Sequence, residues 1–139
     1  MVTCIETQPK VIEWSWPLEE PKRVFVAGKW ESREKIRVVM AKLETLGYVN
    51  AHDWTEHKVF GYTASELDMA GVAQCDIFIF VADEPLNFRG AYAELGAAIA
   101  LNKRIILVGK GADHCIYSLH PLVEHVDSLE ELYETLRRA

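Results

Sequence analysis

Cysteine, long apolar runs and excess positive charge are scarce in this sequence of 139 residues, and each scarcity excludes a class of protein. The three cysteines, Cys4, Cys75 and Cys115, stand far apart and form no C-x-x-C pair, so neither a disulfide framework nor a zinc site is expected. The longest apolar run, Ile77 to Ala82, is far shorter than the ~20 residues that cross a bilayer. The N-terminus also lacks a basic region followed by an apolar stretch. We therefore expect a cytoplasmic protein with no membrane partner.

The charge balance also limits the partners. The 15 basic and 21 acidic side chains give a formal net charge of -6, which repels a phosphate backbone. Nucleic acid is therefore not an expected partner. With 50% apolar and 26% charged residues, the composition is typical of a compact domain, and the length suits a single core.

Apolar runs alternate with amphipathic segments from Arg23 to the end of the chain. Strands are predicted at 23–28, from 48, at 76–82 and at 104–109, and helices at 32–46, 63–74, 89–102 and 128–138. Nearly continuous apolar strands that alternate with helices indicate a parallel sheet covered on both faces. We expect a single Rossmann-like or flavodoxin-like three-layer α/β domain over residues 23–139, with a parallel sheet of four or five strands. Residues 1–22 are predicted to form an arm that packs Trp14 and Trp16 onto this domain.

Several helix ends carry recognisable signals. Gly47 follows the first predicted helix as a C-terminal glycine does. Thr63 with Glu66, and Ser128 with Glu131, have the spacing of a capping box at the start of a helix.

Ligands bind beyond the carboxyl ends of the strands in such sheets, which directs attention to the loops 28–32, 52–61, 83–90 and 109–120. The first loop has one glycine where a dinucleotide fingerprint needs three, and the chain contains no G-x-x-x-x-G-K-[ST]. No nucleotide cofactor is expected. Lys29, Ser32 and Arg33 are either phosphate contacts at a helix N-terminus or solvated residues at the start of a helix.

Two carboxylates and one aromatic pair are candidates for chemistry. Glu94 stands among small and apolar residues, where a carboxylate is costly unless it is paired or used, although it can also face water. Asp68 lies on the helix before the third strand and has the same two interpretations. Asp53 and Trp54 offer a carboxylate beside a broad aromatic face, which can hold a planar base, unless Trp54 only covers the core.

The five histidines show no metal-ligand spacing, since H-E-x-x-H is absent and His52 and His57 lie five residues apart in a loop. No metal is expected. A Ser/His/Asp triad is not supported either, because the chain contains no G-x-S-x-G.

The segments S-E-L-D-M-A-G-V-A-Q-C-D-I-F-I-F and R-G-A-Y-A-E-L-G-A-A-I-A-L-N-K-R-I-I-L-V-G resemble the nucleoside 2-deoxyribosyltransferase superfamily, which includes 2'-deoxynucleoside 5'-phosphate N-hydrolases. The similarity covers roughly residues 23 to 138, and its most specific part is G-x-x-x-E-L-G-x-A. The resemblance implies that Glu94 is the nucleophile and Asp68 the acid that assists departure of the base. It further implies retaining cleavage of an N-glycosidic bond without a cofactor or a metal.

The chain departs from the family at two places. A tyrosine that hydrogen-bonds the nucleophile in many members is matched here by Phe25, and Tyr92 is a neighbour that can replace its hydroxyl. The serine-rich phosphate contacts of the hydrolases are matched by Asn87, Phe88 and Arg89, which leaves Arg89 and Lys29 as the cations for a phosphate. The substrate-binding residues we expect are Gly28, Lys29, Asp53, Trp54, Arg89, Gly90, Tyr92 and Ser118.

The resemblance also implies a homodimer or a larger homo-oligomer in which a neighbouring subunit closes the pocket. By position, the segment from Gly111 to Pro121 would make that contribution, through His114, Tyr117 and Ser118.

Three functions follow from these observations. The first is cleavage of 2'-deoxynucleosides or their 5'-monophosphates, with transfer of the sugar to another base or to water. The second is a catalytically silent nucleotide-binding or sensor module, which the phenylalanine at position 25 favours. The third is a NAD glycohydrolase, because that reaction also breaks a ribosyl N-glycosidic bond.

Overall fold

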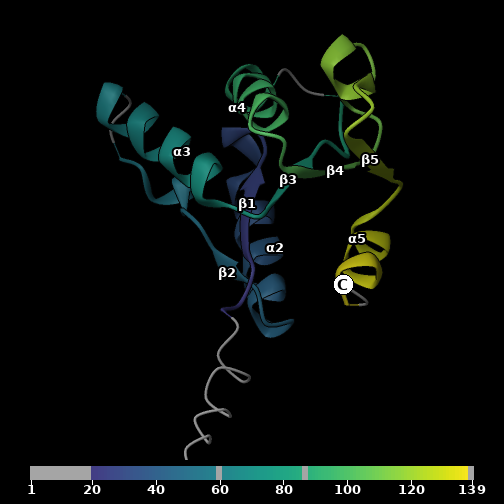
Figure 1. Cartoon of the computed structure of the whole chain (residues 1–139), viewed down its shortest axis with the longest axis horizontal. Helices are drawn as coiled ribbons and strands as arrows, with labels where there is room; N and C mark the ends of the chain where they lie inside the picture. The colour runs from purple at the N-terminus through teal and green to yellow at the C-terminus, as the bar shows by residue number, and fades with distance from the viewer. Residues whose placement is uncertain (1–19, 59–60, 86–87, 138–139) are drawn as a thin grey trace, which may run out of the picture.

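A computed structural model of the chain describes residues 20–58, 61–85 and 88–137. Its centre is a sheet of five parallel strands in the order β2-β1-β3-β4-β5 (Figure 1). The strands are β1 (Arg23–Ala27), β2 (Val49–Asn50), β3 (Ile77–Val81), β4 (Arg104–Val108) and β5 (Val123–Val126). The predicted α/β class with a parallel sheet is confirmed. Most of the predicted arm, with Trp14 and Trp16, lies outside the described residues.

The three middle strands are buried almost completely, which explains their continuous apolar sequences. Phe25 of β1 lies opposite Phe78 of β3 in the register, and the two rings stack with centroids 5.8 Å apart. The edge strand β5 buries Val123 and Val126 while its two middle residues are exposed. This half-exposed pattern carries little apolar signal, so the position of a fifth strand was not predicted.

Helices cover both faces of the sheet, as a three-layer domain requires. They are α2 (Arg33–Thr45), α3 (Tyr62–Gln74), α4 (Arg89–Ala100) and α5 (Leu129–Arg137), with short 3-10 turns η3 (Trp30–Ser32), η4 (Trp54–Glu56) and η5 (Ile116–Leu119). Helices α3 and α4 pack side by side on one face, and α2 and α5 lie on the other (Figure 1). None of the helices in the described part of the chain is long and apolar enough to cross a membrane.

The predicted helix ends are partly confirmed. Gly47 has a φ of 96°, the left-handed conformation that ends a helix. Ser128 Oγ accepts the Glu131 N–H at 3.1 Å, while the Glu131 carboxylate accepts from Asp127 instead of completing the box on Ser128. The capping box at Thr63 is wrong, because α3 begins one residue earlier, at Tyr62, and its N-cap is Gly61.

The strand order creates a crevice at the carboxyl ends of β1 and β3. The chain leaves β1 toward β2 on one side and leaves β3 toward β4 on the other, so the two loops diverge at this point. The Lys35 ammonium joins α2 to the loop after β3 through Asp83 and Glu84, both at 3.1 Å. Gly28 follows β1, and a Cβ atom there would lie 2.6 Å from Ile36 Cδ1, so the loop passes close to α2. The fold therefore leaves this crevice open for a ligand.

Candidate active site

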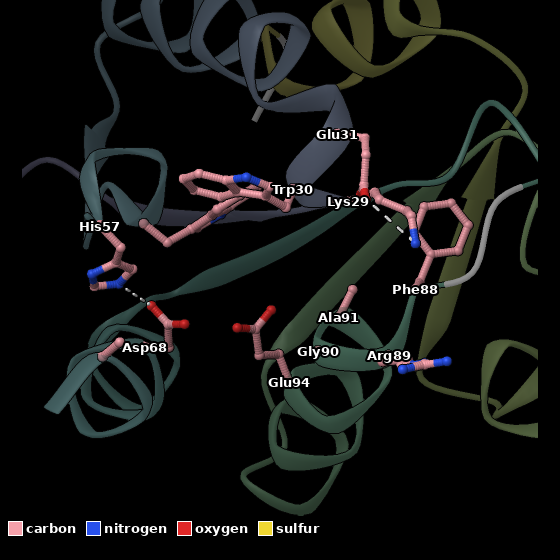
Figure 2. A pocket seen from close by; sticks show the side chains of 13 residues that line it. Lys29, Trp30, Glu31, His57, Asp68, Phe88, Arg89, Gly90, Ala91 and Glu94 are labelled. Carbon is pink, nitrogen blue, oxygen red and sulfur yellow. Dashed lines mark hydrogen bonds and ion pairs between the residues drawn. The ribbon is translucent and has the colours of Figure 1, made fainter. Parts of the chain in front are cut away.

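A cavity of about 530 Å³ occupies the crevice between β1 and β3, within the range of small-molecule sites. Four segments contribute to it: the loop after β1, the η4 region, the first half of α3, and the start of α4 (Figure 2). The lining residues are Gly28, Lys29, Trp30, Glu31, Trp54, His57, Ala64, Asp68, Phe88, Arg89, Gly90, Ala91 and Glu94.

Glu94 stands in the second turn of α4 with its carboxylate directed into this cavity (Figure 2). Its neighbours Ala91, Leu95 and Ala98 face the sheet and are buried, so the helix lies close and Glu94 is only 9% exposed. It accepts no hydrogen bond from any side chain or backbone group in the described ranges. Burial, and secondarily the negative charge of Asp68, raises the pKa of Glu94 to about 8. An unpaired, poorly solvated carboxylate is typical of a reactive group.

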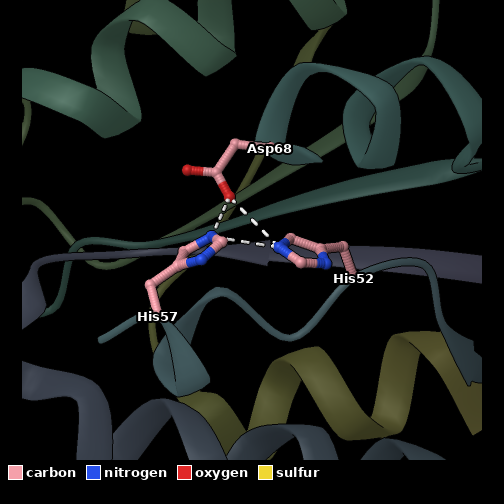
Figure 3. A group of neighbouring side chains, drawn as sticks. All are labelled: His52, His57 and Asp68. Carbon is pink, nitrogen blue, oxygen red and sulfur yellow. Dashed lines mark hydrogen bonds and ion pairs between the residues drawn. The ribbon is translucent and has the colours of Figure 1, made fainter. Parts of the chain in front are cut away.

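Asp68 extends from α3 toward the same space, opposite Glu94 (Figure 2). One of its oxygens, Oδ1, lies 3.0 Å from His57 Nε2 and 3.4 Å from His52 Nε2. The two ring nitrogens are 3.1 Å apart, so the three atoms form a small triangle (Figure 3). No hydrogen bond from a described residue is found for the second oxygen of Asp68, which lines the cavity and can meet a ligand there.

The wall opposite the helices is aromatic. Trp30 and Trp54 lie with ring centroids 6.2 Å apart at 45°. Trp54 is nearly buried, and its indole N–H donates to the Val26 carbonyl at 2.6 Å, so it fixes the η4 turn on β1. Trp30 is half-buried and stacks under the Arg33 guanidinium at 4.5 Å. Such a wall offers a face to a planar base.

Positive charge lies at the other end of the cavity. Arg89 is exposed at the first position of α4, and no interaction with another described residue is found for it. The N-cap, Phe88, has no side chain that bonds the first N–H groups of α4. Lys29 lies across the opening, 3.7 Å from Glu31. Free N–H groups at a helix N-terminus beside an arginine are suited to an anion.

The structure brings most of the predicted site residues into one cavity. Those that line it are Glu94, Asp68, Gly28, Lys29, Trp54, Arg89 and Gly90. Three predicted substrate-binding residues do not line it, namely Asp53, Tyr92 and Ser118. Each of these three has another partner that explains its position.

Asp53 caps η4, where its carboxylate accepts the Thr55 N–H at 3.0 Å. Tyr92 packs edge-on against Phe80, and its hydroxyl lies 3.2 Å from His114 Nε2, so it does not replace the family tyrosine beside Glu94. Ser118 is fully buried and donates to the Ala112 carbonyl at 2.9 Å, which prevents it from reaching a neighbouring subunit.

Six of the lining residues were absent from the predicted set, and two of them, Trp30 and His57, bear directly on the chemistry of the site. Trp30 lies in the first of the predicted ligand loops, so its position was a usable signal. His57 lies in the second predicted ligand loop, but its contact with Asp68 gave no signal, because Asp68 is eleven residues away on another element. The spacing of the histidines gave no sign that His52 and His57 would meet Asp68, yet the three side chains come together as a group that could hold a metal ion.

Comparison with known proteins supports the fold assignment. The chain is similar to the CMP N-glycosidase BcmB of Clostridium botulinum, with 26% identity, a TM-score of 0.64, and coverage of 85% of this chain and 100% of that one. It is similar to the 2-deoxyribosyltransferase of Bacillus psychrosaccharolyticus, with 15% identity, a TM-score of 0.65, and coverage of 82% and 95%. The 2-deoxyribosyltransferase of Leishmania mexicana matches with 21% identity, a TM-score of 0.54, and coverage of 63% and 64%. No protein-family model and no curated protein matches the sequence.

The fold that the sequence resemblance implies, that of the 2-deoxyribosyltransferases, is thus confirmed. The match to the CMP N-glycosidase spans that protein's full length.

Proposed function

We propose, from the fold shared with N-glycosidases and 2-deoxyribosyltransferases, that this chain cleaves the N-glycosidic bond of a nucleoside or nucleoside 5'-monophosphate. The observation that supports this most strongly is Glu94, a buried carboxylate that faces Asp68 across a nucleotide-sized cavity. Most enzymes that cleave glycosidic bonds use two carboxyl groups, one on each side of the bond that breaks.

In the proposed reaction, Glu94 attacks the anomeric carbon, and the bond to the base breaks with its electrons on the base. In the reactive form, the one proton of this carboxyl pair is on Asp68, which passes it to the departing base, and a glycosyl ester of Glu94 results. Water attacks the ester in a hydrolase and returns the sugar with a hydroxyl group, or a second base attacks it in a transferase. Asp68 takes up the proton of the attacking water or base, which restores both carboxyl groups.

The side chains around the two carboxylates match the parts of such a substrate. Trp30 and Trp54 offer the aromatic wall for the base, next to Asp68. Arg89, with the N-terminus of α4, offers charge for a 5'-phosphate, at the start of the helix that carries Glu94. The Clostridium botulinum neighbour is an N-glycosidase of CMP, a 5'-monophosphate, which agrees with this arrangement.

The proposal is tested by chromatography of the base released from a panel of nucleosides, deoxynucleosides and their 5'-monophosphates, with and without a second base. We expect release by the wild type and none by Glu94→Ala. Glu130→Ala replaces an exposed glutamate on α5 in the same way; it is the matched control and should retain the wild-type rate. A folded wild type that is stabilised by nucleotides but releases no base would contradict catalysis and favour the sensor function. Release of nicotinamide from NAD, with no release of base from the other substrates, would favour the NAD glycohydrolase.

Arg89→Ala is expected to raise KM for 5'-monophosphates by about tenfold to a hundredfold, because a charge-assisted bond to phosphate contributes roughly 1.5–3 kcal/mol. KM for the corresponding nucleosides should stay the same, since they have no phosphate. Steady-state kinetics on one nucleoside and its monophosphate provide the comparison. Equal losses on both substrates would show that Arg89 does not bind the phosphate.

A further inference from the structure

We infer that His52, His57 and Asp68 form a binding site for a divalent transition-metal ion of the zinc class, and that the ion withdraws Asp68 from the substrate. The second part rests on the proposed function, whereas the first stands on the geometry of the three side chains (Figure 3).

The distances fit a common ion. The edges of the triangle are 3.0, 3.1 and 3.4 Å. Ligand atoms about 2.1 Å from one zinc ion lie about 3.0 Å apart at right angles and about 3.4 Å apart at the tetrahedral angle. All three edges therefore lie within the span that a single ion imposes on its ligands.

When Asp68 is ionised, hydrogen bonds alone do not satisfy these three atoms. An imidazole nitrogen either carries a proton and donates or lacks it and accepts, while a carboxylate oxygen accepts. If both Nε2 atoms donate to Asp68, two donors face each other at 3.1 Å. If only one ring carries its proton on Nε2, the Nε2 of the other ring is an acceptor. That acceptor then faces the Asp68 oxygen, which is also an acceptor. A cation among three lone pairs resolves the conflict, with both rings in the Nδ1–H form.

The chain holds these ligands in place before any ion binds. Trp54, between the two histidines, is fastened to β1, and Thr55 accepts from Arg37 Nε at 3.0 Å. Gly71 permits α3 to approach, because a Cβ atom there would lie 2.8 Å from His52 Cβ. Two imidazoles and one carboxylate are the donor set of open zinc and iron sites, which keep positions for a further ligand.

The position of the site predicts its effect. His57 and Asp68 line the cavity and His52 does not, so the ion would lie at the cavity wall. An ion bound to Asp68 Oδ1 competes for the carboxyl group that must give a proton to the base. Occupation should therefore slow cleavage of substrates whose base needs protonation.

Binding is measured directly by titrating the chelator-treated full chain with Zn²⁺ in a calorimeter and with Co²⁺ in an absorption spectrometer. We expect one ion per chain, and affinity at least about tenfold lower in His52→Ala and His57→Ala. His125→Ala, an exposed histidine on β5, should bind like the wild type. His52→Gln retains the volume of the side chain if the alanine variant does not fold. A folded wild type that binds no ion, or equal affinity in all variants, would overturn the site.

The second measurement follows base release as Zn²⁺ is added and then removed by a chelator. Base release by the wild type should slow by about tenfold or more when Zn²⁺ is added and recover when the chelator removes it. The rate of His52→Ala should be the same with and without Zn²⁺. Inhibition that is equal in both proteins would overturn the competition for Asp68. If no substrate is cleaved at all, the proposed function fails while the calorimetric result still decides the metal site.

Discussion

Replacing Glu94 by glutamine is expected to abolish base release and at the same time to stabilise the folded protein at neutral and alkaline pH. The amide cannot attack the anomeric carbon, so kcat/KM should fall by at least about 10³-fold. The stability gain has a different origin. Glu94 is 9% exposed and has no hydrogen-bond partner among the described residues, so its negative charge is poorly solvated in the folded state.

The direction of the pH dependence follows from the pKa of Glu94, which is about 8 in the folded protein against 4.5 for a free side chain. Between these values the unfolded chain releases the proton that the folded chain retains. The stabilising contribution of the protonated group is complete below pH 4.5 and is lost as the pH rises through 8. The wild type at pH 7 therefore carries a penalty of about 3 kcal/mol that the glutamine variant lacks.

Thermal unfolding at pH 5 and pH 8 measures this penalty. The amount by which the Tm of Glu94→Gln exceeds that of the wild type should be roughly 10 °C larger at pH 8 than at pH 5. Glu130→Gln, with an exposed glutamate, should show no such change. A constant difference between Glu94→Gln and the wild type would mean that Glu94 is ionised and well solvated at pH 5. In the same pH range, kcat/KM of the wild type should rise as Glu94 becomes ionised.

Replacing Asp68 by asparagine should lower kcat/KM by about 10²- to 10⁴-fold, the usual contribution of a general acid. The loss should depend on the leaving base. A purine nucleoside methylated at N7 carries its positive charge already and departs without a proton, so its kcat/KM should fall by less than about tenfold.

The comparison of the two substrates distinguishes an acid from a residue that only maintains the pocket. Asp68 also contacts His57 at 3.0 Å, and its replacement disturbs that contact for every substrate alike. Equal losses on the ordinary and the methylated nucleoside would therefore exclude the role of acid. Asp113→Asn, an exposed aspartate after β4, serves as the control and should match the wild type on both.

The same cavity connects stability with activity. Helix α4 packs tightly because its residues toward the sheet are small, and this packing removes water from Glu94. A carboxylate that is costly to bury is also a stronger partner for positive charge that develops on a sugar ring. The instability predicted for the wild type at high pH is thus a consequence of the feature that we propose for catalysis.

The sequence by itself determined the layers of the fold and the first catalytic candidate. Continuous apolar strands such as 77–81 can only be covered on both faces, which requires a parallel sheet between helices. Glu94 was identifiable because the residues beside it in the chain are small and apolar, so the cost of burying it is visible locally. The half-exposed strand β5 lacked this local signal, and its position came from the structure.

Only the tertiary structure decided which polar residues share the cavity. Tyr92 and Ser118 lie near the predicted loops, yet their hydroxyl groups are engaged by His114 and by the Ala112 carbonyl. His52, His57 and Asp68 belong to different elements, and no spacing along the chain reveals that α3 brings Asp68 within 3.4 Å of both rings. Hydrophobic periodicity fixes where a helix faces the core, whereas contacts between polar side chains depend on how the helices and loops are placed on the sheet.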